Sequence, residues 1–538
     1  MNPTTTGADL PLAVDSVATV WARAQQWRPE VLVPLLASAG VVVAAPFNCD
    51  AAWYMVAARR MLQGDRLFVD LLDTNPPLIV WLTAIPAFLS TLLNVSDRIL
   101  MHSFTAFLLV CSGLLAGRIL RLAPAPSRPL AFVLVAAFAT GLSVPWVITM
   151  AQREQIAAVL IFPYVLLAAR AACGAETKRG LRLLVGGLAA IGVGLKPFFL
   201  GPWVVVELTV LLLRREVVAL KRLEVGVVVL SQAVYVLLVI ALTPAYFSEI
   251  VPFARATYGA YGTTWQAVAM SRKAAAVLSI ALAGLVAPSL LGVRRGALSE
   301  MLGAATLGFL LSYIVQAKGW YYQLIPALVF AACTVIALID ATVAAARARL
   351  KDEGVPTLPL AAIAVAAIMV AAWVGPHAYR MLRLNVRVMA QGRPPAEPVL
   401  VRIASELARG EPIYFLSTAM WPAFPVINDS GTDWPYRYPF LWPLPGFYPG
   451  RRGERVPYRP PARQAPLERR FFEAVVSDLT ATPPRVLFVE RGPNQQAMEG
   501  RDFDFIQYFS GSPDFRQLFA RYRSQGRVGA WDVYLLLR

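Results

Sequence analysis

Charge and histidine are scarce in this sequence. Asp, Glu, Lys and Arg together make up 15% of the 538 residues, whereas about 25% is typical of soluble domains. The only histidines are His102 and His377, so a His-rich metal site or a histidine-based catalytic triad is not expected. Hydrophobic residues reach 57%, which excludes a soluble globular protein and a disordered one. The composition therefore predicts a polytopic membrane protein.

The four cysteines are far apart, at Cys49, Cys111, Cys173 and Cys333. No Cys-x-x-Cys pair is present, so neither a disulfide framework nor a thiolate metal site is indicated. The first 30 residues lack an early apolar core, so no cleavable signal peptide is expected. A Walker A motif is also missing, and ATP-driven transport therefore has no motor within the chain.

The net charge is nevertheless +17, from 50 Lys and Arg against 33 Asp and Glu. Such an excess can indicate nucleic-acid binding, but the basic residues lie between apolar runs and form no continuous patch. Membrane proteins gather Lys and Arg in cytoplasmic loops. We therefore expect a lipid bilayer, and no nucleic acid, as the partner of this chain.

Short polar gaps separate the apolar runs, and several of the polar segments are basic. The apolar runs are 31–47, 77–93, 99–117, 129–150, 155–173, 183–213, 225–243, 273–292, 299–317, 321–346 and 358–375. The basic clusters are Arg23/Arg28, Arg118/Arg121/Arg128, Lys178/Arg179/Arg182, Arg214/Arg215/Lys221/Arg222, Arg294/Arg295 and Arg347/Arg349/Lys351. If all six clusters are cytoplasmic, an even number of membrane crossings must separate each neighbouring pair.

Two runs have to be reinterpreted to satisfy this parity. The run 77–93 opens on two prolines and carries Pro86, so we expect an interfacial or re-entrant helix on the outer side. The run 183–213 is interrupted by Lys196 and Pro197, which predicts two short helices that meet there. The result is eleven spans, with the N-terminus cytoplasmic and the C-terminus outside.

In this topology three segments lie outside: residues 48–98, residues 244–272 and a tail from about residue 376 to the end. We expect residues 1–375 to form a transmembrane domain and residues 376–538 a soluble one. In the tail, strand-like runs at 413–417, 486–490 and 533–537 alternate with helix-like stretches at 397–409 and 466–479, whereas 421–465 has little regular structure. The sequence thus predicts a polytopic α-helical membrane protein with a small C-terminal α/β domain.

An acidic residue directly follows the first predicted span. Residues 48–81 read NCDAAWYMVAARRMLQGDRLFVDLLDTNPPLIVW. Asp50 is followed by an amphipathic helix, a Gly-Asp turn and an extended piece that ends at Pro76–Pro77. On its own, Asp50 could be solvated or could cap the helix that begins at Ala51. The ordered arrangement of helix, turn and proline pair behind the acid favours a functional role.

This order of residues resembles the first periplasmic loop of the GT-C membrane glycosyltransferases, with protein O-mannosyltransferases and the aminoarabinose transferases of lipid A as the closest comparison. The matching positions are Asp50, Tyr54, Ala58, Leu62, Gly64, Asp65, Pro76, Pro77, Leu78, Trp81 and Leu82. The resemblance implies a GT-C-like transmembrane domain whose catalytic motif lies in 48–98. It also implies that Asp50 is the catalytic base and that the donor is a sugar on a polyprenyl phosphate.

The implied chemistry suits a carboxylate. A sugar hydroxyl is a weak nucleophile, so a positioned carboxylate that accepts its proton assists the attack. The leaving group is the lipid phosphate, so cations must meet the developing negative charge.

A second acid is expected in the outer loop 149–155. The family carries an acid after the third span, and Glu154 lies there, although the aminoarabinose transferases have Asp at that place. Glu154 could orient the acceptor, or it could hold a divalent cation together with Asp50. The alternative is that Arg153 and Glu154 are a snorkelling pair at a helix end.

Three basic residues on the outer side are candidates for binding the donor phosphate: Lys196 at the helix break, Lys318 at the end of the ninth span and Arg255 in the loop 244–272. Interfacial lysines also snorkel without binding a ligand. The candidates for a sugar or lipid groove, or for an interfacial aromatic belt, are Tyr54, Trp320, Tyr321 and Tyr322. Arg59 and Arg60 on the surface helix could touch lipid headgroups.

The sequence therefore predicts a glycosyltransferase of the bacterial inner membrane. It would move a sugar from a polyprenyl-phosphate donor to an envelope glycan, lipid or protein on the periplasmic side. Two alternatives stay open. A lipid or sugar translocase would need polar residues within the spans, and a non-catalytic envelope-assembly protein would use the tail as a binding module. No internal repeat is present, which weighs against an inverted-repeat transporter.

Overall fold

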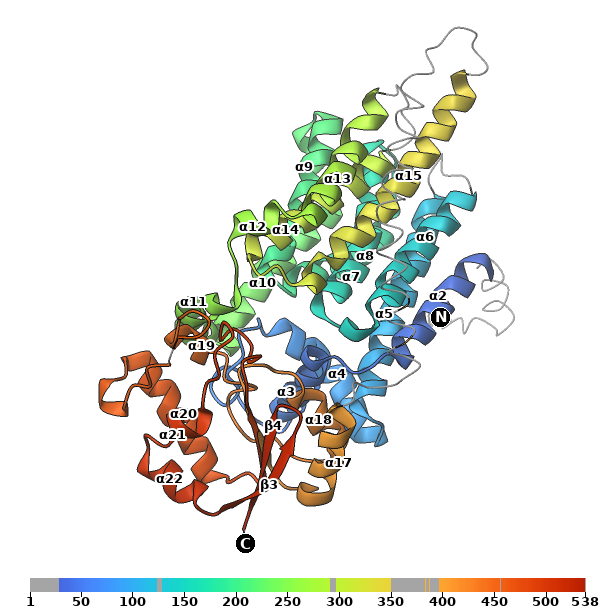
Figure 1. Cartoon of the computed structure of the whole chain (residues 1–538). Coiled ribbons are helices and arrows are strands. Elements are labelled where there is room, and N and C mark those ends of the chain that lie inside the picture. The colour runs from blue at the N-terminus through green and yellow to red at the C-terminus, as the bar shows by residue number, and fades with distance from the viewer. Residues whose placement is uncertain are drawn as a thin grey trace, which may run out of the picture.

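A computed structural model describes residues 29–122, 128–290, 297–349, 383, 387, 396–454 and 456–537. A bundle of helices occupies one end of the molecule, and a part that contains a β-sheet occupies the other (Figure 1). The bundle helices are α2 (Pro29–Ala44), α5 (Asp97–Arg121), α6 (Arg128–Ser143), α7 (Arg153–Ala172), α8 (Arg179–Gly194), α9 (Leu200–Arg214), α10 (Leu223–Leu242), α13 (Arg272–Leu290), α14 (Leu298–Gln316) and α15 (Ile325–Arg349).

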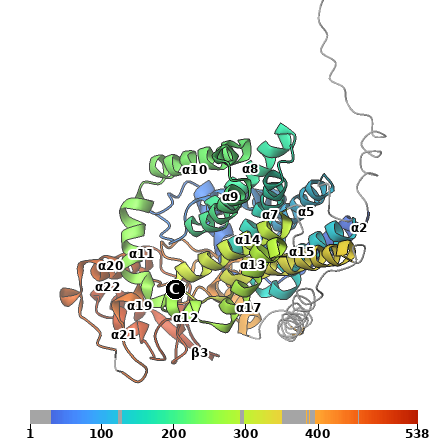
Figure 2. The same ribbon diagram turned by 90° about the horizontal axis from the view of Figure 1, so that it is seen from above.

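Seven of the described helices are long and apolar enough to cross a membrane, and the number rises to eight if α2 and α3 (Cys49–Leu62), which meet at 76°, form one broken span. α10 lies at the edge of the bundle (Figure 2) and exposes Leu230 and Leu237, by 66% and 65%. Such an apolar outer face belongs in lipid. A polytopic α-helical membrane protein is thus confirmed, whereas the count of eleven spans stays a prediction. The run 358–375 and the cluster Arg23/Arg28 lie outside the described residues.

The predicted break in the long run 183–213 is confirmed. α8 ends at Gly194, the 3-10 turn η2 covers Pro197–Phe199, and α9 follows directly. Lys196 itself has an extended backbone, with φ −158° and ψ 133°. The proline cannot donate a backbone hydrogen bond, so the helical ladder stops before it. The break presents the Lys196 side chain at the junction of two helices.

The segments that parity places outside lie together at one end of the bundle (Figure 1). They comprise α3, α4 (Leu78–Leu93) and four short elements of the loop 244–272, namely η4 (Tyr246–Ile250), α11 (Val251–Thr257), η5 (Tyr258–Tyr261) and α12 (Trp265–Ala269). The loop also contacts the C-terminal part, because the Tyr261 hydroxyl donates to the carbonyl of Thr418 at 2.6 Å. The compartment that this end faces stays a prediction.

The C-terminal part contains a four-stranded sheet of order β1–β2–β4–β3. β1 (Ile413–Leu416) is parallel to β2 (Val486–Glu490), β2 is antiparallel to β4 (Trp531–Leu536), and β4 is antiparallel to β3 (Tyr522–Val528). Phe415 of β1 lies opposite Phe488 of β2, and their rings stack at 4.5 Å. The helices are α17 (Ala396–Ala408), α18 (Ala423–Ser430), α19 (Leu444–Phe447), α20 (Pro466–Ala481), α21 (Phe505–Phe509) and α22 (Pro513–Phe519).

The three predicted strands and both predicted helices of the tail are therefore present. The edge strand β3 was not predicted, and the stretch 421–465 contains α18 and α19 where little regular structure was expected. The predicted boundary between the two domains, at residue 375, lies outside the described residues and stays a prediction.

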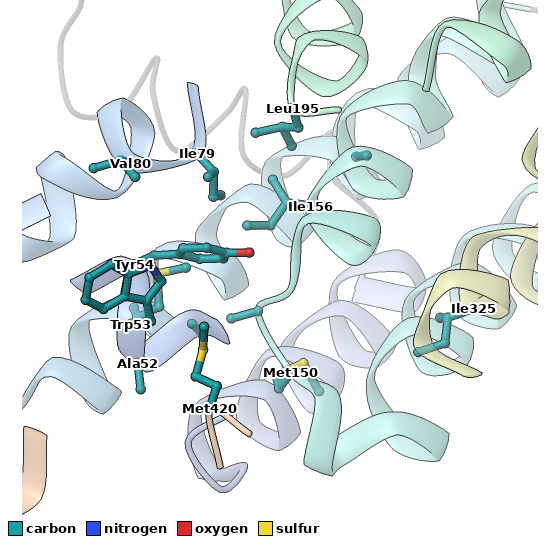
Figure 3. Close-up of a cluster of buried hydrophobic side chains, with 14 of the residues drawn as sticks. Ala52, Trp53, Tyr54, Ile79, Val80, Met150, Ile156, Leu195, Ile325 and Met420 are labelled. Atoms are coloured by element: carbon teal, nitrogen blue, oxygen red, sulfur yellow. The ribbon is translucent and has the colours of Figure 1, made fainter. Parts of the chain in front are cut away.

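Helix α3 is held from two sides. On the bundle side, Tyr54 extends toward Ile156 of α7, and Ile79 of α4 packs beside it (Figure 3). On the other side, the Asn428 side-chain amide of α18 donates to the carbonyl of Ala52 at 3.1 Å. Its neighbour Trp53 packs edge-on against Phe424. The orientation of α3 therefore depends on both parts of the chain.

The two arginines of α3 contact protein groups. Arg59 forms an ion pair with Asp97, and Arg60 pairs with Asp65 at 2.6 Å and donates to the carbonyls of Trp434 and Tyr436. The expectation that this pair binds lipid headgroups is therefore wrong for Arg60, whose guanidinium is occupied by the C-terminal part. Arg59 keeps a partly exposed side chain beside its ion pair.

Candidate active site

Asp50 lies in the first turn of α3, and the cap of that helix is its neighbour Asn48. The Asn48 side-chain oxygen accepts from the Asp50 backbone N–H at 3.0 Å, and its amide donates to the carbonyl of Ile148 at 3.1 Å. The alternative in which Asp50 caps the helix is therefore wrong. The carboxylate is left for other contacts, and the positive end of the helix dipole favours its charge.

The side chain of Gln152 reaches Asp50 from the start of α7. Its Nε2 donates to Asp50 Oδ2 at 2.7 Å and to Asn48 Oδ1 at 3.2 Å. The residue before it, Ala151, has φ +65°, a left-handed conformation that is unusual for alanine. The connection between η1 (Val144–Thr149) and α7 is therefore bent so that Gln152 points at the acid of another helix.

Three charged groups surround Asp50 and Gln152. Arg153 is 7% exposed, interacts electrostatically with Asp50, Glu154, Tyr54 and Tyr322, and its Nε has no hydrogen-bond partner among the described residues. Glu154 is 1% exposed and accepts from Lys196 Nζ at 3.0 Å. The structure thus brings the predicted Asp50, Glu154 and Lys196 together and adds Arg153, a buried cation that the sequence pattern suggested only as a snorkelling residue.

A further carboxylate, that of Asp73, lies close to the same group. The Trp53 indole donates to Asp73 Oδ2 at 2.8 Å, and the Asn75 amide donates to both of its oxygens. Burial raises the pKa of Asp73, while these hydrogen bonds lower it. Asp73 interacts electrostatically with Asp50 and Arg153. We refer to Asp50, Asp73, Arg153, Glu154 and Lys196 as the charged cluster.

The charged cluster sets the proton affinity of Asp50. Burial raises the pKa of Asp50 to about 6, and the nearby carboxylates of Glu154 and Asp73 act in the same direction. The charges of Arg153 and Lys196 oppose this effect. Asp50 is therefore mainly ionised at neutral pH, yet it binds a proton more readily than an ordinary aspartate, which suits a general base.

No protein-family model matches this sequence, and no curated protein matches it. The structure matches ArnT from Cupriavidus metallidurans bound to undecaprenyl phosphate, with a TM-score of 0.51 and 14% identity over 96% of this chain and 98% of that chain. The chain has the GT-C membrane fold. Weaker matches are the apo state of the same ArnT, with a TM-score of 0.48, and the archaeal oligosaccharyltransferase AglB from Archaeoglobus fulgidus in complex with an inhibitory peptide and a dolichol-phosphate. AglB gives a TM-score of 0.45 and 11% identity over 92% of this chain and 72% of that chain.

Residues of three further segments, namely Lys318, Tyr258 and Tyr322, interact with the charged cluster. Lys318, just after α14, donates from Nζ to the carbonyl of Tyr258 at 2.6 Å, and the ammonium lies 4.3 Å from the centre of that ring. Burial, and then the charge of Lys196, lower the pKa of Lys318 to about 8. Tyr258 and Tyr322, of the 3-10 turn η6 (Tyr321–Leu324), both interact electrostatically with Asp50.

Of the remaining candidates, Tyr54 also interacts electrostatically with Asp50 and Arg153 of this cluster, whereas the others have different surroundings. Arg255 is exposed on α11. The Tyr321 ring stacks under the ammonium of Lys273 at 4.5 Å, and Trp320 packs against Tyr322. Tyr54 is 1% exposed. Whether these aromatic side chains line a sugar or lipid groove stays a prediction.

The charged groups do not match a divalent-cation site. Within the described residues there is no set of three or more His, Cys, Asp or Glu side chains that could hold a metal ion. Glu154 is bound by Lys196, and Asp50 by Gln152, so each of the two proposed ligands already has a hydrogen-bond donor on it.

The rate of reaction should depend on the charge of Asp50. Because only the ionised carboxylate accepts a proton, we expect kcat/KM to fall as the pH drops through about 6, the pKa of Asp50 in this surrounding. A pH profile of initial rates with subsaturating donor measures this limb. A limb near 4, the ordinary value for aspartate, would contradict the cluster described here.

The ion pair of Lys196 and Glu154 gives a stability prediction. Lys196→Met removes the hydrogen-bond donor of the buried Glu154 carboxylate and leaves Arg153 as a nearby positive charge. Breaking a buried pair costs about 3–5 kcal/mol, so the thermal midpoint of the detergent-solubilised protein should fall clearly. The double variant Lys196→Met/Glu154→Gln removes both charges and should recover most of that loss. A double variant as unstable as the single one would show that the two side chains do not act as a pair. If the recovered double variant uses donor poorly, Lys196 also serves the phosphate, as the sequence suggested.

Proposed function

We propose that this protein is a glycosyltransferase that moves a sugar from a polyprenyl-phosphate donor to a hydroxyl group of a cell-envelope acceptor. The observation that supports this proposal most is a proton acceptor and a buried cation in one cluster. Asp50 is oriented by Gln152 and interacts electrostatically with the buried Arg153. The ArnT whose fold this chain shares was crystallised with undecaprenyl phosphate, which supports a donor of this chemical class.

The reaction is a single displacement. The hydroxyl oxygen of the acceptor forms a bond to the anomeric carbon while the bond from that carbon to the phosphate oxygen breaks. The electron pair leaves with the polyprenyl phosphate, and the proton of the hydroxyl passes to Asp50. Asp50 Oδ2 is occupied by Gln152, whereas Oδ1 accepts no hydrogen bond from the described residues, so we assign the proton to Oδ1.

The leaving phosphate gains charge as the bond breaks, and fixed cations stabilise it. We assign this role first to Arg153, because its buried guanidinium has an Nε without a partner in the described part of the chain. Lys318 is the second candidate. Among the described residues, its ammonium contacts the carbonyl of Tyr258 and the rings of Tyr258 and Trp320. Lys196 would have to share the phosphate with Glu154, and Arg255 could guide donors at the surface of α11.

The orientation of the protein in the membrane follows from the distribution of Lys and Arg. Lys and Arg gather at the end of the bundle opposite the charged cluster, for example in the last turns of α5 and α9, and such ends face the cytoplasm. We therefore place Asp50 and the C-terminal part on the periplasmic side of a bacterial inner membrane. The acceptor is then an envelope glycan, a lipid or an exported protein.

The test is transfer of labelled sugar by the purified full-length protein. A panel of polyprenyl-phosphate sugars is offered together with a lipid and glycan extract of cell envelopes, and one donor is expected to label an extract component. A protein that labels nothing with any donor, but moves labelled lipid across the bilayer of a vesicle, would instead be a translocase.

A further inference from the structure

The nitrogen of the Gln152 side-chain amide has hydrogen-bond partners, whereas its oxygen has none among the described residues. Nε2 binds Asp50 and Asn48, whereas Oε1 is buried and accepts no hydrogen bond from the described residues. The opposite orientation of the amide would place Oε1 against the Asp50 oxygen, two acceptors with no hydrogen between them. The network therefore fixes which atom faces Asp50 and leaves Oε1 as the open acceptor.

A buried acceptor without a donor is costly, so a native protein keeps one where a ligand or water completes it. Gln155, one turn along α7, also has a buried Oε1 without a partner, but its amide donates to the carbonyl of Leu142, away from Asp50. Gln152 differs because its free oxygen adjoins the carboxylate that receives the acceptor's proton. The Nε2–Oδ2 hydrogen bond joins these two side chains, so Asp50 Oδ1 and Gln152 Oε1 are a charged and a neutral acceptor on neighbouring groups.

We infer that Gln152 binds the acceptor substrate through Oε1 while Nε2 positions Asp50, and that the acceptor is a sugar with vicinal hydroxyl groups. This rests on the proposed function. A hydroxyl has a single hydrogen, which is directed at Asp50 for removal, so a second donor must come from a neighbouring group. The adjacent hydroxyl of a sugar ring supplies it.

The charges of the site favour this acceptor class over two others. A phosphate group brings negative charge and no hydrogen at neutral pH, so it would meet two acceptors and the carboxylate of Asp73. A side-chain amide is a far weaker nucleophile than a hydroxyl, and the other carboxylates of the cluster already accept hydrogen bonds, Glu154 from Lys196 and Asp73 from Trp53. A sugar diol needs one base and one neutral acceptor, which are the two groups present.

Two substitutions test the donor Nε2 and the acceptor Oε1 of Gln152 separately. Gln152→Met keeps the length but removes both the Nε2 donor and the Oε1 acceptor. The KM for acceptor should therefore rise about 3- to 10-fold, as for the loss of one neutral hydrogen bond. Its kcat should fall about 10²-fold, because Asp50 is no longer held. Gln152→Glu keeps an oxygen for the diol but replaces the donor to Asp50, so kcat should fall with little change in acceptor KM. Gln155→Met on the same helix is the matched control and should leave both constants unchanged.

The acceptor class is tested with the envelope extract itself. Periodate cleaves vicinal diols, so extract that has been oxidised with periodate and then reduced should lose its ability to accept sugar, while mock-treated extract keeps it. Extract that still accepts sugar after oxidation, or a Gln152→Met enzyme with the wild-type acceptor KM, would overturn the inference. A wild-type protein that transfers nothing to untreated extract would instead refute the proposed function.

Discussion

Replacing Asp50 with asparagine is expected to lower the rate of sugar transfer about 10²- to 10⁴-fold, the usual contribution of a general base. Asparagine has the same size, and its side-chain oxygen can still accept from Gln152, but it cannot take the proton of the acceptor. The helix cap is supplied by Asn48, so the fold of α3 should not change. Initial rates of label transfer, normalised to the amount of folded protein, measure the effect.

The control for this variant is Asp70→Asn. Asp70 lies on the same outer segment and forms an ion pair with Arg66 at 3.1 Å, but both side chains are partly or largely exposed. Exposed pairs contribute at most about 1 kcal/mol to stability, so this variant should keep wild-type activity. An Asp50→Asn protein that transfers sugar at the wild-type rate would leave only the shared fold, and the translocase interpretation would then be preferred.

The helical architecture could be predicted because apolar runs and charge parity are both long-range patterns. The break at Lys196–Pro197 was visible because proline cannot continue a helix. The strand β3 could not be predicted, because its residues carry no such pattern. Its sequence, Tyr-Arg-Ser-Gln-Gly-Arg-Val, carries no apolar alternation, and its pairing with β4 is an edge contact with mostly exposed side chains.

The active-site motif was found around Asp50 because one local segment carries it. Its partner Gln152 comes from elsewhere in the chain, 102 residues away. Asp73 lies in the same segment as Asp50, and it accepts a hydrogen bond from the indole of Trp53, 20 residues before it. No spacing rule links these positions. A glutamine in a short connection between two helices carries no signal of its own, and only the bent backbone at Ala151 turns it toward the acid.

Arg153 shows why charged residues at helix ends are ambiguous in a sequence. An arginine in the first turn of a span can snorkel to water or turn inward, and both conformations fit the same letters. Here it turns inward, 7% exposed, next to Asp50 and Glu154. Arg255, which the sequence predicts as a ligand of the donor phosphate, remains at the surface. Arg153 and Arg255 differ in burial, and burial depends on the fold rather than on the local sequence.

Replacing Arg153 with glutamine should weaken use of the donor more than use of the acceptor. Loss of one well-placed electrostatic group at a developing charge lowers kcat about 10²- to 10³-fold, so we expect a fall of this size. Arg153→Lys keeps the charge but loses the planar guanidinium that binds phosphate through two N–H groups. Its kcat should therefore lie between those of the wild type and Arg153→Gln.

The same variant should also shift the pH profile. The charge of Arg153 lowers the pKa of Asp50, so without it the folded-state pKa rises above about 6 and the acid limb of kcat/KM moves to higher pH. Arg170→Gln is the matched control, because Arg170 lies in the last turn of the same helix and donates to the carbonyl of Glu176. It should leave the pH limb in place. If Arg153→Gln keeps the wild-type donor KM, rate and pH limb while Asp50→Asn is inactive, the phosphate must be bound elsewhere. The next group to replace would then be Lys318, whose ammonium faces Tyr258 and Trp320 in the described part of the chain.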